Sequence, residues 1–125
     1  MMSDNYNKAL VTGVERISAW AGLLDEINVY PVADGDTGRN LVISLSPMRQ
    51  INDDRPSTIR ALMLAARGNS GNIAAKYFSG FLSMDGPDTL AGAAKLGSRL
   101  AREAVGEPRE GTMLTIFDSL SKILE

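Results

Sequence analysis

The chain has 125 residues, 44% of them hydrophobic and 22% charged, which is typical of one globular domain with a modest core. It contains neither Cys nor His, and this excludes disulfides, cysteine nucleophiles and the usual Zn²⁺ or Fe ligand sets. The net charge of −2 argues against a nucleic-acid partner. No apolar run approaches the ~20 residues of a membrane span, and the N-terminus lacks signal-peptide features, so we expect a cytoplasmic protein without a membrane span.

Hydrophobic residues recur at helical spacing along the whole chain, and sustained period-two alternation is absent from it. The sequence therefore predicts six helices in a single all-α domain covering residues 1–125, arranged as an antiparallel bundle. The first expected helix runs from about Asp4 to Asp25, with Ser3 or Asp4 as its cap, and the second includes Leu41 and ends near Arg49. The third begins at its cap Ser57 and ends at about Ala66, and the fourth follows Arg67–Asn72 and ends at about Leu82. The fifth runs from Asp88 or Thr89 to about Val105, and the sixth begins at its cap Thr112.

The last predicted helix is apolar almost to the end of the chain, where Ile123 and Leu124 precede Glu125. An amphipathic helix of this kind needs a neighbour, because large contiguous apolar patches are rare on soluble monomers. Three explanations are open: the helix packs onto the first helix, the chain is a fragment of a larger domain, or it self-associates through this C-terminal helix.

The most informative segment is the loop Asn28–Asn40, which contains Asp34 and Asp36 on either side of a glycine. A bend there can direct both carboxylates toward one centre, and Mg²⁺ is typically held by one or two carboxylates together with substrate phosphates. Thr37 and Gly38 follow at a predicted helix start, where backbone N–H groups suit an anion. The pattern indicates a nucleotide held through Mg²⁺.

Two further glycine-containing loops also precede predicted helices, at Arg67–Asn72 and Glu110–Thr112. In an up-down helical array these two loops and Asp34–Asn40 all fall at the same end. Three helix starts would then converge, each with unpaired N–H groups and partial positive charge. Taken singly, each loop has a simpler interpretation as a turn or a helix cap. Arg39 and Arg67 are either phosphate contacts or surface charges.

The conjunction of the three loops resembles a known family. The segment Asn28-Val29-Tyr30-Pro31-Val32-Ala33-Asp34-Gly35-Asp36-Thr37-Gly38-Arg39-Asn40 is similar to the Asn-Val-(Phe/Tyr)-Pro-Val-Pro-Asp-Gly-Asp-Thr-Gly-Thr-Asn signature of DhaL domains in bacterial fatty acid kinases. Arg67-Gly68-Asn69-Ser70-Gly71 resembles the second motif of that family, and Glu110-Gly111-Thr112-Met113-Leu114-Thr115 resembles the third. Motif order and approximate spacing agree along the chain.

The resemblance implies a barrel of antiparallel helices that holds ATP or ADP at one end through two Mg²⁺ ions. By position in the motifs, it assigns Asp34 and Asp36 as metal ligands, with Asn28 as the nearest candidate for a third. It places Thr37, Gly38 and Asn40 at the phosphates, Asn69, Ser70 and Gly71 along the nucleotide, and Thr112 and Met113 near the sugar or base. The family domain typically has eight helices, so the six predicted here imply a truncated domain and an incomplete site.

In function, the resemblance implies a kinase that transfers a phosphoryl group from ATP to a fatty acid carboxylate presented by a separate fatty-acid-binding protein. A dihydroxyacetone kinase type of subunit is the related alternative. Two alternatives from other classes are a non-catalytic module that binds a nucleotide or a partner protein, and a structural helical domain in which the acidic loop is only a turn. No catalytic residue beyond the metal ligands is identified. If the missing part of the domain is needed to complete the ATP site, the truncated chain alone is expected to be inactive.

Overall fold

The computed structural model describes residues 2–26, 36–106 and 113–125, and every regular element in them is a helix. The chain is therefore all-α, as its periodicity predicts. No helix in the described ranges is both long and apolar enough to cross a membrane. The elements are α1 (Met2–Glu26), α2 (Thr37–Leu45), the 3₁₀ helix η1 (Ser46–Gln50), α3 (Arg55–Ala65), α4 (Gly68–Phe81), α5 (Pro87–Glu103) and α6 (Met113–Leu124).

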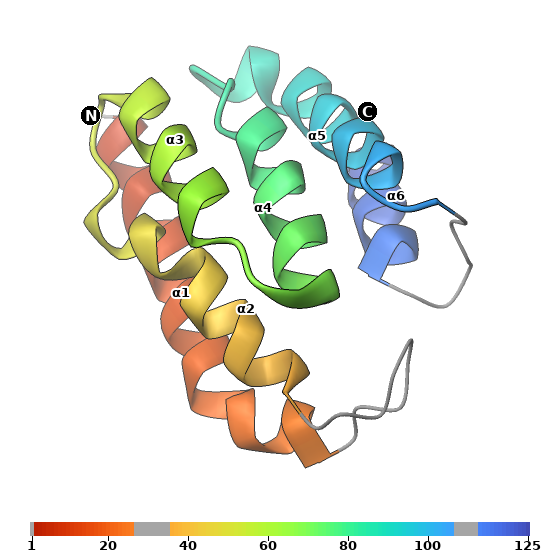
Figure 1. The fold of residues 1–125 in the computed structure, drawn as a ribbon. Coiled ribbons are helices and arrows are strands. Elements are labelled where there is room, and N and C mark those ends of the chain that lie inside the picture. Colours follow the sequence, from red (N-terminus) through yellow and green to blue (C-terminus); the bar gives the residue numbers. More distant parts are fainter. Residues whose placement is uncertain (1, 27–35, 107–112) are drawn as a thin grey trace.

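The helices form an up-down array in which α1 packs on α2, α4 on α5, and α5 on α6, each pair antiparallel (Figure 1). Helices α2 and α4 also pack on each other, but they run in the same direction, because both start at the same end. Helix α3 lies against α4 and η1. The two outermost helices, α1 and α6, do not contact each other within the described residues. The first of the three explanations for the apolar C-terminal helix, that it packs onto the first helix, is therefore wrong for this part of the chain.

Two hydrophobic clusters hold the array together. The larger joins α1, α2, η1, α3 and α4, and its buried members are Val14, Leu41, Leu45, Met48, Leu62, Ala74 and Leu82. The smaller joins α4, α5 and α6 through Tyr77, Ala101 and Leu114, with partly buried Phe81 and Phe117 packed against it. Helix α4 contributes to both clusters, so it is the central element that fixes the two halves relative to each other.

The predicted second helix differs from the structure because of one proline. Helix α2 ends at Leu45, and the chain continues as the 3₁₀ turn η1 with Pro47 in its first turn. Pro47 has no N–H to donate to the carbonyl of Ile43, which an α-helix would require. Both the backbone N–H and the hydroxyl of Ser46 donate to that carbonyl instead, the latter at 2.8 Å. A continuous helix to near Arg49 was therefore a wrong expectation.

The predicted caps of α1 and α3 also differ from the structure. Helix α1 begins at Met2, so Ser3 and Asp4 lie inside it and are not its caps. Helix α3 is capped by Asp54, whose carboxylate accepts from the N–H of Ser57 at 3.2 Å, so Ser57 is the third residue of the helix and not its cap. The expected cap Thr112 lies outside the described residues.

Candidate functional site

Eight of the eleven residues that the sequence assigns to the site lie in the described part of the chain. Asp36, Thr37, Gly38 and Asn40 surround the start of α2, Asn69, Ser70 and Gly71 form the first turn of α4, and Met113 is the first residue of α6. The remaining three, Asn28, Asp34 and Thr112, lie outside the described residues. The starts of α2, α4 and α6 are at the same end of the array, opposite to the N-terminus (Figure 1).

The first two motifs meet where α2 crosses the start of α4. The hydroxyl of Ser70 donates to the carbonyl of Thr37 at 3.4 Å. Two turns further along α2, the buried hydroxyl of Ser44 accepts from the backbone N–H of Arg67 at 2.8 Å and lies 3.4 Å from the Arg67 carbonyl, to which it donates. Residues 23 and 33 positions apart in the sequence are thus joined by side-chain to backbone hydrogen bonds.

The glycines of these motifs have a packing role that the sequence interpretation did not include. A Cβ atom added to Gly71 would overlap the hydroxyl of Ser44, and one added to Gly38 would overlap the carbonyl of Ala21 on α1. Gly68 has a φ of 74° and lies against the side chain of Asn40. Such a φ is strongly unfavourable for most residues with a Cβ. The glycines therefore let α1, α2 and α4 approach closely at this end.

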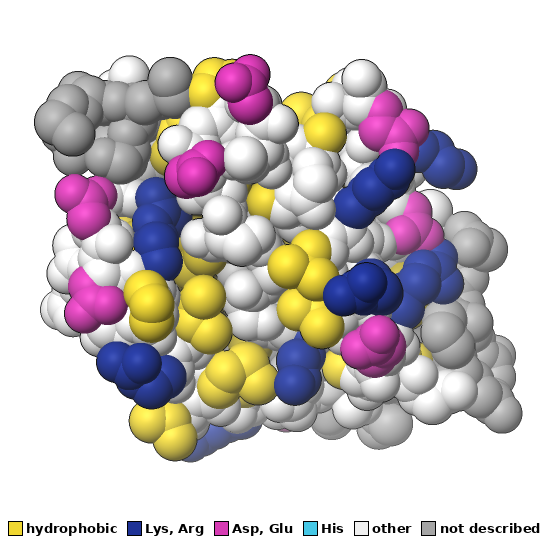
Figure 2. Space-filling model, turned by 90° about the horizontal axis from the view of Figure 1, so that it is seen from above, with side chains coloured by type: hydrophobic (Ala, Val, Ile, Leu, Met, Phe, Trp, Pro, Cys, Tyr) yellow, Lys and Arg dark blue, Asp and Glu magenta, His cyan; other side chains and the backbone are white. Residues whose placement is uncertain are grey.

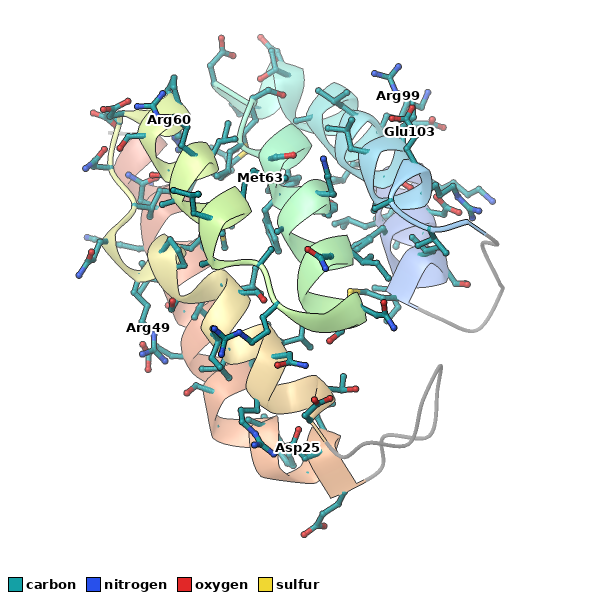
Figure 3. The ribbon with its side chains drawn as sticks, viewed as in Figure 1. Asp25, Arg49, Arg60, Met63, Arg99 and Glu103 are labelled. Atoms are coloured by element: carbon teal, nitrogen blue, oxygen red, sulfur yellow. The ribbon has the colours of Figure 1, made fainter. Side chains whose placement is uncertain are left out.

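The start of α2 is capped by a residue that the sequence analysis did not assign. Asp36 occupies the N-cap position, but its side chain makes no capping hydrogen bond. Asp25, in the last turn of α1, provides the acceptor: its Oδ1 receives the N–H of Gly38 at 2.8 Å and the N–H of Arg39 at 3.1 Å. Figure 3 shows Asp25 at the end of α1. An anion that used these two N–H groups would have to replace the Asp25 carboxylate.

The start of α6 belongs to the same region. Met113 is partly buried and packs against the larger hydrophobic cluster, which is otherwise formed by α1, α2, η1, α3 and α4. Its contact is thus with the part of the molecule that carries the first two motifs, although its helix belongs to the other half.

The donor set fits a hard cation better than a transition metal. The chain has no His or Cys, so oxygen atoms are its main possible metal ligands, and oxygen ligands suit Mg²⁺. Within the described ranges no three Asp or Glu side chains gather into a group that could hold a metal ion. Of the two predicted acidic ligands, only Asp36 is in those ranges.

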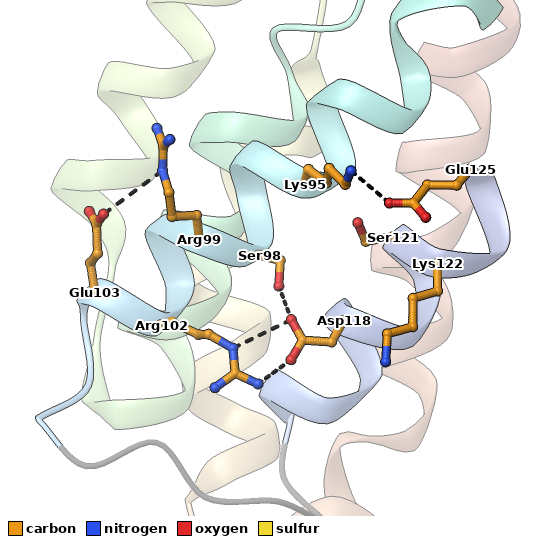
Figure 4. Close-up of a pocket in the computed structure, with 9 residues that line it drawn as sticks. All are labelled: Lys95, Ser98, Arg99, Arg102, Glu103, Asp118, Ser121, Lys122 and Glu125. Atoms are coloured by element: carbon orange, nitrogen blue, oxygen red, sulfur yellow. Dashed lines mark hydrogen bonds and ion pairs between the residues drawn. The ribbon is translucent and has the colours of Figure 1, made fainter.

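A cavity of about 520 Å³ lies elsewhere, in an open groove between α5 and α6 (Figure 4). Its lining includes no residue that the sequence assigns to the site. Each of its acids has a basic partner: Asp118 pairs with Arg102, Glu125 lies 2.7 Å from Lys95, and Glu103 lies 3.9 Å from Arg99. The hydrogen bond from Arg102 lowers the pKa of Asp118, and one from Ser98 adds to this. We interpret the groove as an ion-paired surface and place the candidate site at the helix starts.

Comparison with known proteins gives relatives of the sequence but no activity. No family model matches the chain. It is 34% identical over 126 residues to an uncharacterized protein of Staphylococcus saprophyticus, with 89% of this chain and 23% of the relative covered. An uncharacterized protein of Staphylococcus haemolyticus is 33% identical, and the match covers 90% of this chain and 23% of the relative. An uncharacterized protein of Staphylococcus aureus is 34% identical, and the match covers 86% of this chain and 22% of the relative. The chain thus spans less than a quarter of the length of these relatives.

Proposed function

We propose that this chain is a Mg²⁺-dependent nucleotide-binding domain of the DhaL type. In this proposal it serves a kinase that transfers a phosphoryl group from ATP to a fatty acid carboxylate held by a separate fatty-acid-binding protein. The support comes from three motifs that resemble those of this family, in the same order and at similar spacing. The acceptor and its carrier protein are the part of the proposal that rests on the resemblance alone.

The observation that carries the proposal is the meeting of the first two motifs. Ser70 of the second motif donates a hydrogen bond to Thr37 of the first, and Gly71 packs against the helix that the first motif begins. Two helix starts side by side direct two partial positive charges toward one anionic ligand, which would use the N–H groups of Gly38 and Arg39 only by replacing the Asp25 carboxylate. A nucleotide polyphosphate matches this arrangement.

The residue types suit phosphoryl transfer, which depends mainly on positioning and charge neutralisation. Mg²⁺ would be held by Asp34 and Asp36 and would neutralise charge on the phosphate oxygens when bound. Asn69 and Ser70, in the first turn of α4, would position the phosphates through backbone N–H groups and side chains. This division of roles requires neither a His base nor a Cys nucleophile, and the chain has neither.

Calorimetric titration of the protein with ADP, with and without Mg²⁺, tests the proposal. We expect binding that requires Mg²⁺ and that Asp36→Asn weakens by at least about tenfold, because the variant loses a charged metal ligand. Asp53→Asn is the matched control, since it removes one charge from an exposed acid before α3 and should bind as the wild type does. Undiminished Mg²⁺-dependent binding by the Asp36→Asn variant would contradict the assigned site.

A non-catalytic nucleotide-binding module is the second candidate. It is favoured by the length comparison, because the relatives have more than three quarters of their length outside the matched region. The acceptor site of a kinase could lie there, with this chain only holding the nucleotide. Consumption of ATP by this chain with a fatty-acid-loaded carrier protein would favour the kinase, whereas ADP binding without turnover would favour the module.

A further inference from the structure

The groove between α5 and α6 contains a buried serine whose hydroxyl the ion pairs there do not use. Ser98 and Ser121 both line this groove, and each is only 6% exposed. The hydroxyl of Ser98 donates to the Asp118 carboxylate. The hydroxyl of Ser121 has no hydrogen-bond partner among the described residues, and Figure 4 shows it in the space between the two helices. Because polar groups removed from water normally have a partner, Ser121 marks a place for a ligand atom that accepts a hydrogen bond.

Ser121 lies between the two ion pairs that join α5 to α6. One turn before it, Asp118 is held tightly, because Arg102 donates to both of its carboxylate oxygens. One turn after it, Glu125 lies 2.7 Å from Lys95, but these two side chains are 51% and 64% exposed. Exposed ion pairs contribute little to stability. Another carboxylate can therefore replace that of Glu125 at Lys95 with little loss of stability.

The lining of the groove is basic, although the chain as a whole is acidic. Four basic and three acidic side chains line the groove, whereas the whole chain has 13 basic and 15 acidic residues. Within the described ranges, Lys122 is the basic residue of this lining without an ion pair. Lys95 lowers the pKa of Glu125, and the charge of Lys122 adds to this effect. An anion in the groove would thus meet one unpaired lysine and one that is only loosely paired.

We propose that this groove is a binding site for a small organic dicarboxylate. One carboxylate takes the place of the Glu125 side chain at Lys95 and accepts a hydrogen bond from Ser121, and the other neutralises Lys122. In the view of Figure 4, the ammonium groups of Lys95 and Lys122 lie on opposite sides of Ser121. The volume of about 520 Å³ is within the range of ~300–1,000 Å³ that is usual for small-molecule sites. This inference does not depend on the proposed nucleotide site.

An NMR titration of isotope-labelled protein with succinate, at constant ionic strength, tests the site directly. We expect the backbone amide signals of Lys95, Ser121 and Lys122 to shift together and to saturate at one midpoint. Sodium chloride is the control for general screening of charge and should give no saturating shift. Inorganic phosphate is the second control. It should bind more weakly than succinate, because one compact anion cannot neutralise two lysines on opposite sides of Ser121.

Two variants identify the groups that hold the ligand, and each has a matched control. Ser121→Ala should weaken succinate binding by about threefold to tenfold, because a hydrogen bond to the carboxylate is lost. Ser119→Ala, on the exposed face of the same helix, should bind as the wild type does. Glu125→Gln should strengthen binding by about twofold to fivefold, because it removes the competing carboxylate. Glu103→Gln removes an equal charge beside Arg99 and should leave the affinity nearly unchanged.

Each outcome decides for or against the inference. Saturating shifts at the three residues, together with weaker binding by Ser121→Ala and tighter binding by Glu125→Gln, support it. Shifts that fail to saturate, or that sodium chloride reproduces, would overturn the site. An unchanged affinity in either variant would overturn the binding mode. Phosphate binding as tight as that of succinate would overturn the assignment to a dicarboxylate.

Discussion

At the residue scale, Tyr77 shows how burial changes the chemistry of one side chain. Its ring lies parallel to that of Phe117, with 3.8 Å between the ring centroids, and it packs in the smaller cluster between α4, α5 and α6. Its hydroxyl is buried and has no hydrogen-bond partner among the residues that the structure describes. A buried hydroxyl without a partner loses its hydration and gains nothing in exchange. Tyr77 thus contributes its ring to the core, while its hydroxyl is unfavourable there.

We therefore expect Tyr77→Phe to leave the free energy of unfolding at pH 8 unchanged or to raise it by about 1 kcal/mol. Burial raises the pKa of Tyr77 from 10.0 to about 12. The unfolded chain then loses this proton before the folded protein does, so the contribution of Tyr77 to stability is complete below pH 10 and declines as the pH rises toward 12.

The variant should consequently lose less stability than the wild type between pH 8 and pH 11, as measured by urea unfolding at both values. Ionisation of the other side chains is common to the two proteins and cancels in the comparison. An equal loss of stability in the wild type and the variant would show that Tyr77 does not ionise differently in the folded protein.

The same scale shows where sequence reasoning stops. Asp36, Thr37 and Ser70 could be selected because their types and spacing match a motif. Asp25 and Ser44 could not, because each acts through a contact with backbone far away in the sequence. An acid near the end of a helix and a serine within one have no distinctive pattern. The only available signal was the short distance in sequence between Asp25 and the acidic loop.

At the element scale, the contact between α4 and α5 depends on two glycines. A Cβ atom at Gly80 would lie 2.7 Å from the backbone nitrogen of Gly97, and one at Gly97 would lie 2.6 Å from the carbonyl oxygen of Tyr77. The two helix backbones thus touch directly at this crossing. Alanines at positions 75, 93, 94 and 101 are also buried. Small side chains therefore allow α4 and α5 to pack closely.

Gly97→Ala should destabilise the protein by about 1–3 kcal/mol, because the new methyl group would force the helices apart. Gly92→Ala is the control: it lies in the same helix with nothing within 4 Å of the added Cβ, and should raise stability by about 0.5–1 kcal/mol through helix propensity. Urea unfolding of both variants gives the comparison. A Gly97→Ala variant as stable as Gly92→Ala would contradict the close crossing.

The existence and order of the helices could be predicted because apolar residues recur at helical spacing in each of them. Their ends were harder to predict, since local hydrogen bonds decide them. Asp54 and Ser57 are both of residue types that commonly cap helices, so the sequence alone does not show which of them caps α3. The hydrogen bond from the Ser57 N–H to the Asp54 carboxylate identifies Asp54 as the cap. Pro47 ends α2 because it has no backbone N–H. This proline was visible in the sequence, but Met48 continues the helical spacing of apolar residues and so suggested a longer helix.

At the scale of the whole molecule, the array is open along the described parts of its two outermost helices. Trp20 and Leu23 of α1 are 59% and 46% exposed, and Ile116 and Ile123 of α6 are 66% and 78% exposed. On the face that Figure 2 shows, hydrophobic side chains likewise lie in small groups between charged ones. Of the explanations for the apolar C-terminal helix, two are still open: a larger domain that covers these edges, and self-association through α6.

The up-down rule predicted correctly that the starts of α2, α4 and α6 share one end (Figure 1). It could not predict that α2 packs beside α4, because that pairing depends on Ser44 and Gly71 fitting each other. The meeting of the two motifs is thus information that only the three-dimensional structure provides. The proposed function depends on it more than on any single residue.

The most direct test of this claim is an NMR titration of isotope-labelled protein with ADP and Mg²⁺. We expect the backbone amide signals of Thr37 and Asn40 to shift together with those of Asn69 and Ser70, at one titration midpoint, while the signal of Ser98 in the groove between α5 and α6 does not move. Shifts confined to that groove, or to only one of the two helix starts, would contradict a shared nucleotide site at the junction of α2 and α4.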